Sequence, residues 1–300
     1  MKRVLLFIGT NILIVLTLSV VARVLGLDRT VTAYGLDMRA LLGFCAVFGF
    51  GGAIISLLLS RWVAKFSLGV ELVDPANPRD SSEAFLVETV RNLASRVGIT
   101  ALPEIGVYPS PEVNAFATDP TKNRALVAVS AGLLDRMDEA AIEGVLGHEM
   151  SHVANGDMVT MTLLQGLANT FVMFFARVVA FAVNQALRGR DGERRGGLGP
   201  FAYYALVWAL ELVFMILASI VINAFSRWRE YRADAGSAGV AGKEKMVHAL
   251  ESLQRYNELV DDRRAAVAAM KINSRGAGLM AKLFSSHPPL EKRIEALRAL

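Results

Sequence analysis

The chain has 300 residues, of which 53% are hydrophobic, and its 32 basic and 28 acidic residues leave a formal net charge of +4. This composition is more apolar than that of a typical soluble protein and predicts a membrane protein. The small basic excess forms no dense Lys/Arg run, which argues against a nucleic-acid partner. A single cysteine, Cys45, excludes an intrachain disulfide and a zinc cluster of thiolates. Any bound metal must therefore be held by His, Asp or Glu.

Two apolar runs near the start predict an N-terminal transmembrane hairpin over residues 1–64. The first run, residues 4–25, follows Lys2 and Arg3 and has the length of a spanning helix of roughly 20 residues. A signal peptide is the alternative, but the run is long and lacks a good cleavage region. The second run, residues 40–62, is also followed by basic residues, which places both ends of the hairpin in the cytoplasm. It contains four positions that we predict to pack closely against other helices: Gly43, Gly49, Gly51 and Gly52.

Two further apolar runs, residues 158–187 and 201–225, predict a second membrane hairpin over residues 158–226. The link between them contains four arginines that fit poorly on the outer side of a membrane: Arg188, Arg190, Arg194 and Arg195. Full spanning and partial insertion under protein cover both stay open for this hairpin. Arg177 and Glu211 would reach a similar depth in it, so we predict that they pair. Separate snorkelling of the two charges, or a wet cavity, is the alternative.

The stretch "GHEMSHVANGD" carries the most specific chemical signal in the chain. It follows Asp138, a good helix N-cap, and its apolar residues recur at helical spacing. On a helix, His148 and His152 lie one turn apart on the same face and can bind one metal ion. Glu149 is offset from them, so it can activate a zinc-bound water without being a ligand. The alternative is an ordinary helix with two structural histidines.

A hydrolytic zinc site needs a third protein ligand, and "SRWREYRADAGS" offers one after the fourth apolar run. We predict Glu230 as this ligand. Asp234, four residues later, is placed to accept the free N–H of a ligand imidazole. The alternative is a charged juxtamembrane helix in which both acids pair with neighbouring arginines.

Taken together, these motifs resemble the HtpX family of membrane zinc endopeptidases, relatives of the CAAX prenyl proteases. The resemblance extends through "VNAFATD", "AVSAGLLDRM", "GHEMSHVANGDMVTMTLLQG", "SRWREYRADAGSA" and "HPPLEKRIEAL". It implies the same three zinc ligands and Glu149 as the catalytic base. It also implies that Asn114, Ala115 and Phe116 form the rim of the substrate cleft, where an edge strand can pair with an extended peptide. Asp119 departs from the glycine of many relatives and puts in doubt only the turn after this strand.

The C-terminal "SSHPPLEKRIEAL" adds two candidate residues. The resemblance suggests that His287 lies near the zinc and donates to the developing oxyanion, and that Arg293 supports it. The alternative is that His287 only caps the helix that begins at Leu290. We interpret His248 as a helix-face residue rather than a ligand, and residues 270–282 as either a flap over the site or a simple connector.

The expected fold is a multi-span α-helical membrane protein with an α+β zincin-like (gluzincin) metalloprotease domain. This domain would be assembled from residues 65–157, with the HExxH helix, and residues 227–300, with the third ligand. The resemblance implies one zinc per chain, polypeptide substrates that are misfolded or damaged membrane proteins, and quality-control partners in a bacterial inner membrane, with catalysis on the cytoplasmic side. The alternatives are a prenyl-protein processing protease and a noncatalytic membrane scaffold that keeps zinc for folding.

Overall fold

The computed structural model describes residues 2–27, 30–32, 35–118, 121–188, 197–267 and 285–300. The chain divides into two compact units. The helical unit contains Met1–Ser56 and Met161–Ile222, and the mixed unit contains Leu57–Thr160 and Asn223–Leu300. Several earlier predictions lie outside the described residues: the stretch 270–282, Asp119, and three of the linker arginines, Arg190, Arg194 and Arg195.

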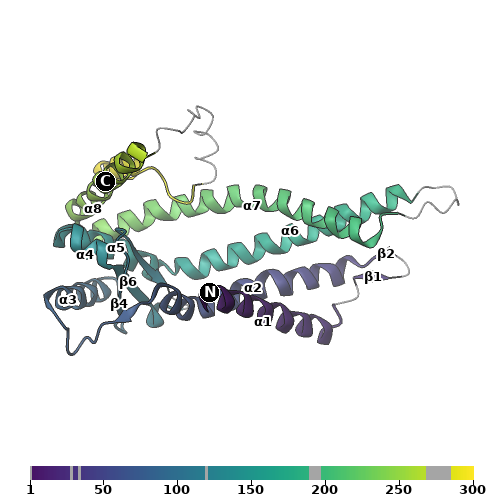
Figure 1. The fold of residues 1–300 in the computed structure, drawn as a ribbon, viewed down its shortest axis with the longest axis horizontal. Coiled ribbons are helices and arrows are strands. Elements are labelled where there is room, and N and C mark those ends of the chain that lie inside the picture. Colours follow the sequence, from purple (N-terminus) through teal and green to yellow (C-terminus); the bar gives the residue numbers. More distant parts are fainter. Residues whose placement is uncertain (1, 28–29, 33–34, 119–120, 189–196, 268–284) are drawn as a thin grey trace. The chain divides into compact units, whose positions relative to one another are not determined.

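Long helices make up the helical unit, together with a short antiparallel pair of strands. The helices that contribute to it are α1 (Lys2–Val24), α2 (Met38–Leu68), α6 (Asp157–Leu187) and α7 (Pro200–Ser237), and the strands are β1 (Val31–Thr32) and β2 (Gly35–Leu36) (Figure 1). Among the described residues, three helical stretches are long and apolar enough to cross a membrane: α2, α6 and the continuous stretch Pro200–Asn257 that α7 opens. These three candidate spans agree with the predicted α-helical membrane fold, whereas the first predicted run contributes only a shorter apolar helix, Ile12–Val24, among the described residues.

Close helix packing in the helical unit uses glycine at three of the four predicted positions. A Cβ atom added to Gly49 would lie 2.3 Å from Thr170 Oγ1 on α6, so only glycine allows this approach. A Cβ atom on Gly43 or Gly51 would likewise meet a leucine side chain within 3 Å. Gly52 has no atom within 4 Å of its Cβ position, so the prediction was wrong there. It lies on a part of α2 that faces open space.

The two charges inside the second hairpin pair as predicted. Arg177 Nη1 on α6 lies 2.6 Å from Glu211 Oε1 on α7, and Arg177 also donates to the Met173 carbonyl at 3.0 Å. The guanidinium further lies 5.9 Å from the centre of the Phe44 ring on α2. Each charge thus has a partner in a region where an isolated charge is costly.

A four-stranded sheet organises the mixed unit. Its strands are β3 (Glu71–Leu72), β4 (Glu104–Tyr108), β5 (Ala115–Thr118) and β6 (Leu126–Ser130), in the order β3-β4-β6-β5. β4 and β6 are parallel, whereas β5 runs antiparallel to β6 with Ala115 opposite Val129. β6 is buried along its whole length, which fits its continuous apolar sequence. β5 therefore forms one edge of the sheet.

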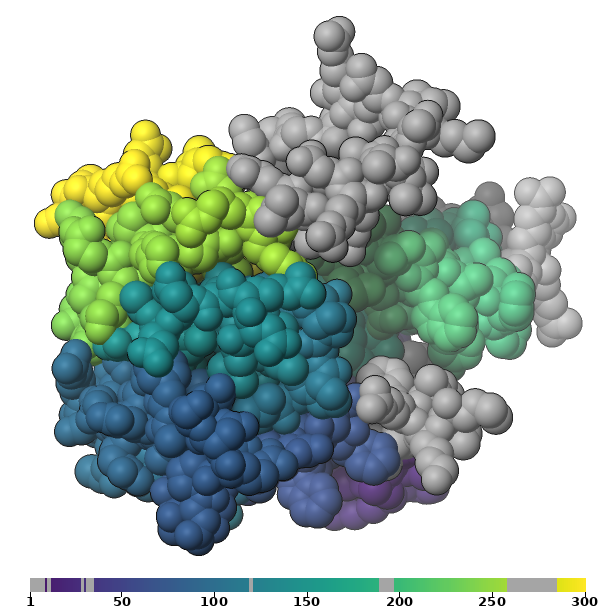
Figure 2. Space-filling model, turned by 60° about the vertical axis from the view of Figure 1, so that its left-hand side comes forward, coloured from purple at the N-terminus to yellow at the C-terminus, as the bar shows by residue number. Residues whose placement is uncertain are grey.

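Helices of the mixed unit pack around this sheet and around one another. They are α3 (Ser81–Arg96), α4 (Ala131–Arg136), α5 (Glu139–Asn155), α8 (Lys243–Val267) and α10 (Leu290–Ala299), with a short 3-10 turn, η1 (Lys122–Arg124), and a π-helical segment, η2 (Ala238–Gly242). Figure 2 shows α5, α8 and α10 side by side on one face, in teal, green and yellow. The core beneath them includes Leu86, Val90, Leu146 and Met150, whose side chains are fully buried from solvent.

The end of α2 belongs to the mixed unit, although the sequence predicted a boundary between residues 64 and 65. Arg61 Nη1 and Lys65 Nζ lie 3.5 Å and 2.6 Å from the same carboxylate oxygen of Glu104 on β4. These contacts attach the last turns of α2 to the sheet. The unit boundary at Leu57 follows from this attachment.

Candidate metal centre

The central helix of the site begins and ends on strong local signals. The Asp138 carboxylate accepts a hydrogen bond from Ala141 N at 2.9 Å, which confirms the predicted N-cap of α5. The helix ends at Asn155, and Gly156 adopts a left-handed conformation with φ of 66°. This residue ends α5, and α6 starts directly after it at Asp157.

Two glycines let other helices approach α5 closely. A Cβ atom on Gly147 would lie 2.6 Å from Ser237 Oγ at the end of α7. One on Gly144 would lie 2.4 Å from the Lys245 carbonyl oxygen on α8. The close approach of α7 brings Glu230 to the face of α5 that carries the two histidines.

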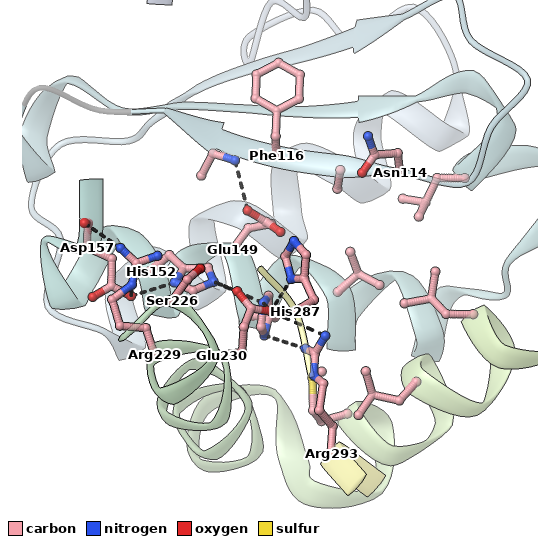
Figure 3. A pocket seen from close by; sticks show the side chains of 18 of the residues that line it. Asn114, Phe116, Glu149, His152, Asp157, Ser226, Arg229, Glu230, His287 and Arg293 are labelled. Atoms are coloured by element: carbon pink, nitrogen blue, oxygen red, sulfur yellow. Dashed lines mark hydrogen bonds and ion pairs between the residues drawn. The ribbon is translucent and has the colours of Figure 1, made fainter. Parts of the chain in front are cut away.

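His148, His152 and Glu230 form a group whose ligand atoms all lie within 4.8 Å of one another (Figure 3). The two Nε2 atoms are 3.1 Å apart. Glu230 Oε2 lies 3.5 Å from His148 Nε2, and Glu230 Oε1 lies 3.4 Å from His152 Nε2. The structure thus brings together the three residues that the sequence predicted as ligands, in the two-histidine, one-carboxylate combination typical of hydrolytic zinc sites.

The remaining ring nitrogens show that this donor set fits a cation. His148 Nδ1 lies 2.9 Å from Asp234 Oδ1, and His152 Nδ1 lies 2.6 Å from Asp157 Oδ2. A neutral imidazole that donates from Nδ1 presents the lone pair of Nε2. Both lone pairs then point to the same place as the carboxylate of Glu230. Glu230 Oε2 is buried and accepts no hydrogen bond of regular geometry among the described atoms, although His287 Nδ1 lies 2.8 Å away. A divalent cation satisfies all of these acceptors.

The electrostatic field at the site also favours positive charge. Burial would lower the pKa of His152, but the carboxylates of Asp157 and Glu230 outweigh burial and raise this pKa to about 9. Burial likewise opposes ionisation of Glu230, yet the surrounding histidines hold its pKa well below the usual range. Acidic groups that stabilise an imidazolium in this way also stabilise a bound metal cation.

Glu149 lies beside the metal group and contacts the edge strand instead of joining the ligands. Its Oε2 accepts a hydrogen bond from Ala117 N on β5 at 3.0 Å. In Figure 3 the carboxylate points from α5 toward β5, on the side of the cavity where Phe116 lies. The carboxylate is therefore held at the border between the metal group and the surface of the edge strand.

The two C-terminal candidates lie at the site, but in different roles from one another. His287 Nδ1 lies 2.8 Å from Glu230 Oε2, and the His287 side chain is 65% exposed. Arg293 is buried and makes two contacts with the Asp234 carboxylate, of which Nε to Oδ2 is 2.7 Å. Arg293 also lies 3.3 Å from His148 Nδ1 through Nη2 and 3.4 Å from Glu230 Oε2 through Nη1. Among the described contacts of Arg293, none is with His287, so Arg293 contacts the candidate ligands and Asp234 instead of the residue it was expected to support. The helix that follows is N-capped by Pro289, not by the His287 side chain.

Asp157 and Arg229 belong to the site, although the sequence did not single them out. Asp157 is buried and holds His152, and Arg229 Nη1 donates to the Asp157 carbonyl oxygen at 2.7 Å. Burial lowers the pKa of Arg229, and the nearby carboxylates oppose this shift. The signal available in the sequence was an acidic residue directly after a glycine that ends the HExxH helix.

His248 lies outside the metal group, as predicted for a helix-face residue. Its Nε2 is 2.7 Å from Asp138 Oδ2 at the opposite end of α5 from the ligands. This contact links α8 to the N-cap of α5.

A cavity of about 470 Å³ opens over the metal group. The edge strand forms one wall, with Asn114, Ala115 and Phe116 among the lining residues. α5 and α7 contribute the candidate ligands and Glu149, and His287 lies at the same cavity (Figure 3). The predicted substrate rim and the predicted ligands therefore line the same space.

The chain is similar in sequence to known proteins. Residues 80–300 match the sequence profile of peptidase family M48. The chain is 53% identical to a protein named Protease HtpX from Shewanella halifaxensis, over 100% of both chains. It is 49% identical to a protein named Protease HtpX homolog from Bacillus licheniformis, over 99% of both chains.

The fold resembles that of a solved structure. The crystal structure of S. mikatae Ste24p superposes with a TM-score of 0.60 at 20% sequence identity. The match covers 85% of this chain and 58% of the Ste24p chain. At this identity the likeness concerns the fold alone.

Proposed function

Because the chain belongs to peptidase family M48 and is therefore a metalloprotease, we propose that it is a zinc endopeptidase with His148, His152 and Glu230 as metal ligands. The observation that carries this proposal is the convergence of two imidazole Nε2 atoms and one carboxylate within 4.8 Å. The carboxylates behind both imidazoles fix the tautomer that a metal requires.

Zinc bound by these residues would polarise the scissile carbonyl and make a water molecule more acidic. Glu149 is placed to take the proton of the attacking water and to deliver it to the leaving amine. The hydrogen bond from Ala117 N holds one carboxylate oxygen of Glu149, which leaves the other oxygen for this proton. Glu149 thus acts as general base and then as general acid.

The edge position of β5 supports the proposed mode of peptide binding. An extended substrate would add to β5 as a further strand, with backbone hydrogen bonds providing affinity independent of sequence. Asn114 lies at the start of this strand and lines the cavity, so we assign it to holding the substrate backbone. Ala115 and Phe116 complete the rim. This mode suits unfolded polypeptides, which can adopt an extended conformation.

His287 is our candidate for stabilising the oxyanion. Its side chain is exposed, and the polar contact that it makes among the described residues is with Glu230, so it can turn toward a bound substrate. Arg293 acts behind the ligands, because its buried guanidinium fixes Asp234 and thereby the His148 ring. We therefore assign substrate contact to His287 and positioning to Arg293.

We further propose that the natural substrates are misfolded or damaged membrane proteins, cleaved during quality control in a bacterial inner membrane. The three apolar stretches long enough to span a membrane support a multi-pass topology. Basic residues that flank the first hairpin favour a cytoplasmic location for the mixed unit under the positive-inside rule. Other quality-control proteins of the same membrane are the expected partners.

The test is to incubate the purified, zinc-loaded protein with casein, an unfolded substrate. Wild-type protein should cleave casein, whereas Glu149→Gln should retain zinc and lose at least about 100-fold in rate, the usual contribution of a general base. Glu230→Ala should lose both zinc and activity. Cleavage by both wild type and Glu149→Gln would implicate a contaminating protease, and full zinc content in Glu230→Ala would remove Glu230 from the ligands.

The substrate rim has a separate test. Asn114→Ala should weaken cleavage of several peptides without reducing zinc content, because Asn114 is assigned to the substrate and not to the metal. Unchanged kinetics across these peptides would reject its role.

A further inference from the structure

The end of α2 exposes an apolar stripe on the mixed unit. Leu58, Trp62 and Phe66 recur every four residues and so lie on one face of the helix. Their exposed fractions are 59%, 74% and 52%. Arg61 and Lys65 face another way, toward Glu104 on the sheet. This stripe would be unfavourable in water, although it lies in the unit that carries the metal group.

A further exposed aromatic residue, Trp228, lies on α7, also within the mixed unit. Trp228 is 55% exposed, its ring centre is 5.6 Å from that of Phe225, and the Arg232 guanidinium lies 5.9 Å from the Trp228 ring centre. Tryptophan is enriched at the level of lipid headgroups, and arginine is attracted to anionic headgroups. An exposed Trp with an adjacent Arg is the combination expected at a membrane surface.

The apolar runs end close to both features. Trp62 ends the apolar run on α2, and Phe225 ends the one on α7. Glu230 follows Phe225 by five residues, which is about 7–8 Å along a helix. On the other side of the hairpin, α6 begins at Asp157, the residue that holds His152. All candidate ligands therefore lie within a few helical turns of segments apolar enough to be in the membrane.

From these observations we propose that Leu58, Trp62, Phe66, Trp228 and Arg232 form an interfacial surface that rests on lipid headgroups. This surface holds the metal group at the membrane surface. The protease then acts preferentially on the juxtamembrane segments of membrane-anchored polypeptides, which pass the site at short range. This inference rests on the proposed function, because it concerns which peptide bonds the same metal group cleaves.

The depth of Trp228 tests the surface directly. The full-length protein with Trp62→Phe and Trp208→Phe retains Trp228 as its single tryptophan. It would be reconstituted into vesicles that contain anionic lipid and phosphatidylcholine brominated at defined acyl positions. Quenching of Trp228 should be strongest with bromine nearest the headgroup. Two outcomes would overturn the proposal. One is that no brominated lipid quenches Trp228. The other is that quenching is lost only at high protein density, which would indicate that a second copy of the chain covers the surface.

Cleavage of anchored substrates tests the functional consequence. Each substrate has one membrane anchor and the same cleavable sequence. A flexible linker places this sequence either about 8 or about 40 residues from the membrane. Wild-type protein in vesicles should cleave the near site about tenfold faster, because the shorter tether raises the concentration of this site at the metal group. Equal rates would overturn the proposal.

Variants separate this inference from the proposed function. Trp62→Ser with Trp228→Ser should reduce the near-to-far preference severalfold, and Arg232→Gln should reduce it when anionic lipid is present. All three changes should leave casein cleavage in detergent within about twofold, as expected for exposed side chains that do not line the cavity over the metal group. Leu300→Ser, a change at an apolar residue that is 73% exposed at the C-terminus, is the matched control and should keep the preference. If the folded Trp62→Ser and Trp228→Ser double variant keeps the near-to-far preference, the interfacial surface is refuted. If the wild-type protein does not cleave casein, the protease assignment itself is refuted.

Discussion

At the scale of single residues, a different carboxylate orients each candidate imidazole ligand. Asp234 was predictable, because it lies four residues after Glu230 on the same helix. Asp157 was not predicted, since its position depends on the left-handed turn at Gly156 that ends α5. Helical periodicity identifies neighbours within a helix, but it does not describe a neighbour that lies beyond the end of that helix.

Removing the charge of Asp157 should weaken metal binding. We expect Asp157→Asn to lower zinc affinity roughly 10- to 100-fold, the usual effect of losing a carboxylate behind a histidine ligand. Competition with a chromophoric chelator measures this affinity. Asp135→Asn, an exposed change on α4, is the matched control. Equal affinity in wild type and Asp157→Asn would show that the contact with His152 does not orient the ring for metal.

The N-cap of α5 should make stability depend on pH. The pKa of Asp138 is lowered by the hydrogen bond from Ala141 N, then by His248, with a smaller effect of Arg255. A carboxyl group whose pKa is depressed by folding stabilises the protein above its unfolded pKa, and this contribution is lost as pH falls through the folded pKa. Since Asp138 is exposed, we expect Asp138→Ala to cost only about 1 kcal/mol near neutral pH.

Melting in detergent as a function of pH measures this effect. The difference between wild type and Asp138→Ala should shrink as the solution becomes acidic enough to protonate Asp138. Asp138→Asn is the informative control, because asparagine caps helices nearly as well but does not titrate. A difference that stays constant down to the most acidic pH that the fold tolerates would contradict a charged cap.

At the scale of helices and strands, local signals determined much of what the sequence predicted. The N-cap at Asp138, the period of α5 and the start of the last helix at Leu290 are local features, and the structure has all of them. The strand order β3-β4-β6-β5 is not local. β4 pairs with β6, although β5 lies between them in the sequence. Gly52 illustrates the same limit, since composition alone does not tell which face of α2 meets another helix.

Packing of α7 on α5 should control the third ligand. In Gly147→Ala, the new Cβ would lie 2.6 Å from Ser237 Oγ and 2.9 Å from Ala241 Cβ. Overpacking of this kind costs about 1–3 kcal/mol. Because Glu230 lies on α7, the displaced helix should also bind zinc more weakly. Thermal melting in detergent and metal analysis of the purified variant measure both effects.

Gly239→Ala serves as the control for this substitution. Its Cβ would have no neighbour within 4 Å, so the change should leave melting and zinc content nearly unaltered. Wild-type zinc affinity in Gly147→Ala, together with normal stability, would mean that α5 and α7 do not need their close approach.

At the scale of the whole molecule, three of the four apolar runs in the sequence coincide with described helices long and apolar enough to span a membrane, but hydropathy did not predict the limits of the two units. The last turns of α2 are apolar enough to look like membrane, yet Arg61 and Lys65 attach them to β4 through Glu104. A pair formed between residues about 40 positions apart is invisible to a local window. The two halves of the mixed unit are likewise separated in sequence by the second hairpin, and the resemblance of the motifs, rather than periodicity, predicted that they join.

The second hairpin also permits a test of the partly buried ion pair that the sequence predicted. Arg177 and Glu211 are each only about one quarter exposed, and their contact joins α6 to α7. We expect Arg177→Met or Glu211→Gln to destabilise the full-length protein by about 1 kcal/mol, since polar contacts between membrane helices contribute modestly.

Reversal of either charge, in Arg177→Glu or Glu211→Arg, should cost more, because it places like charges together. The double exchange should then recover part of the loss, as for two residues in direct contact. Melting of wild type, the two charge reversals and the double exchange in the same detergent measures this coupling. If the double exchange is as unstable as the sum of the two reversals, the pair does not hold α6 and α7 together, and each charge is stabilised separately by its own surroundings.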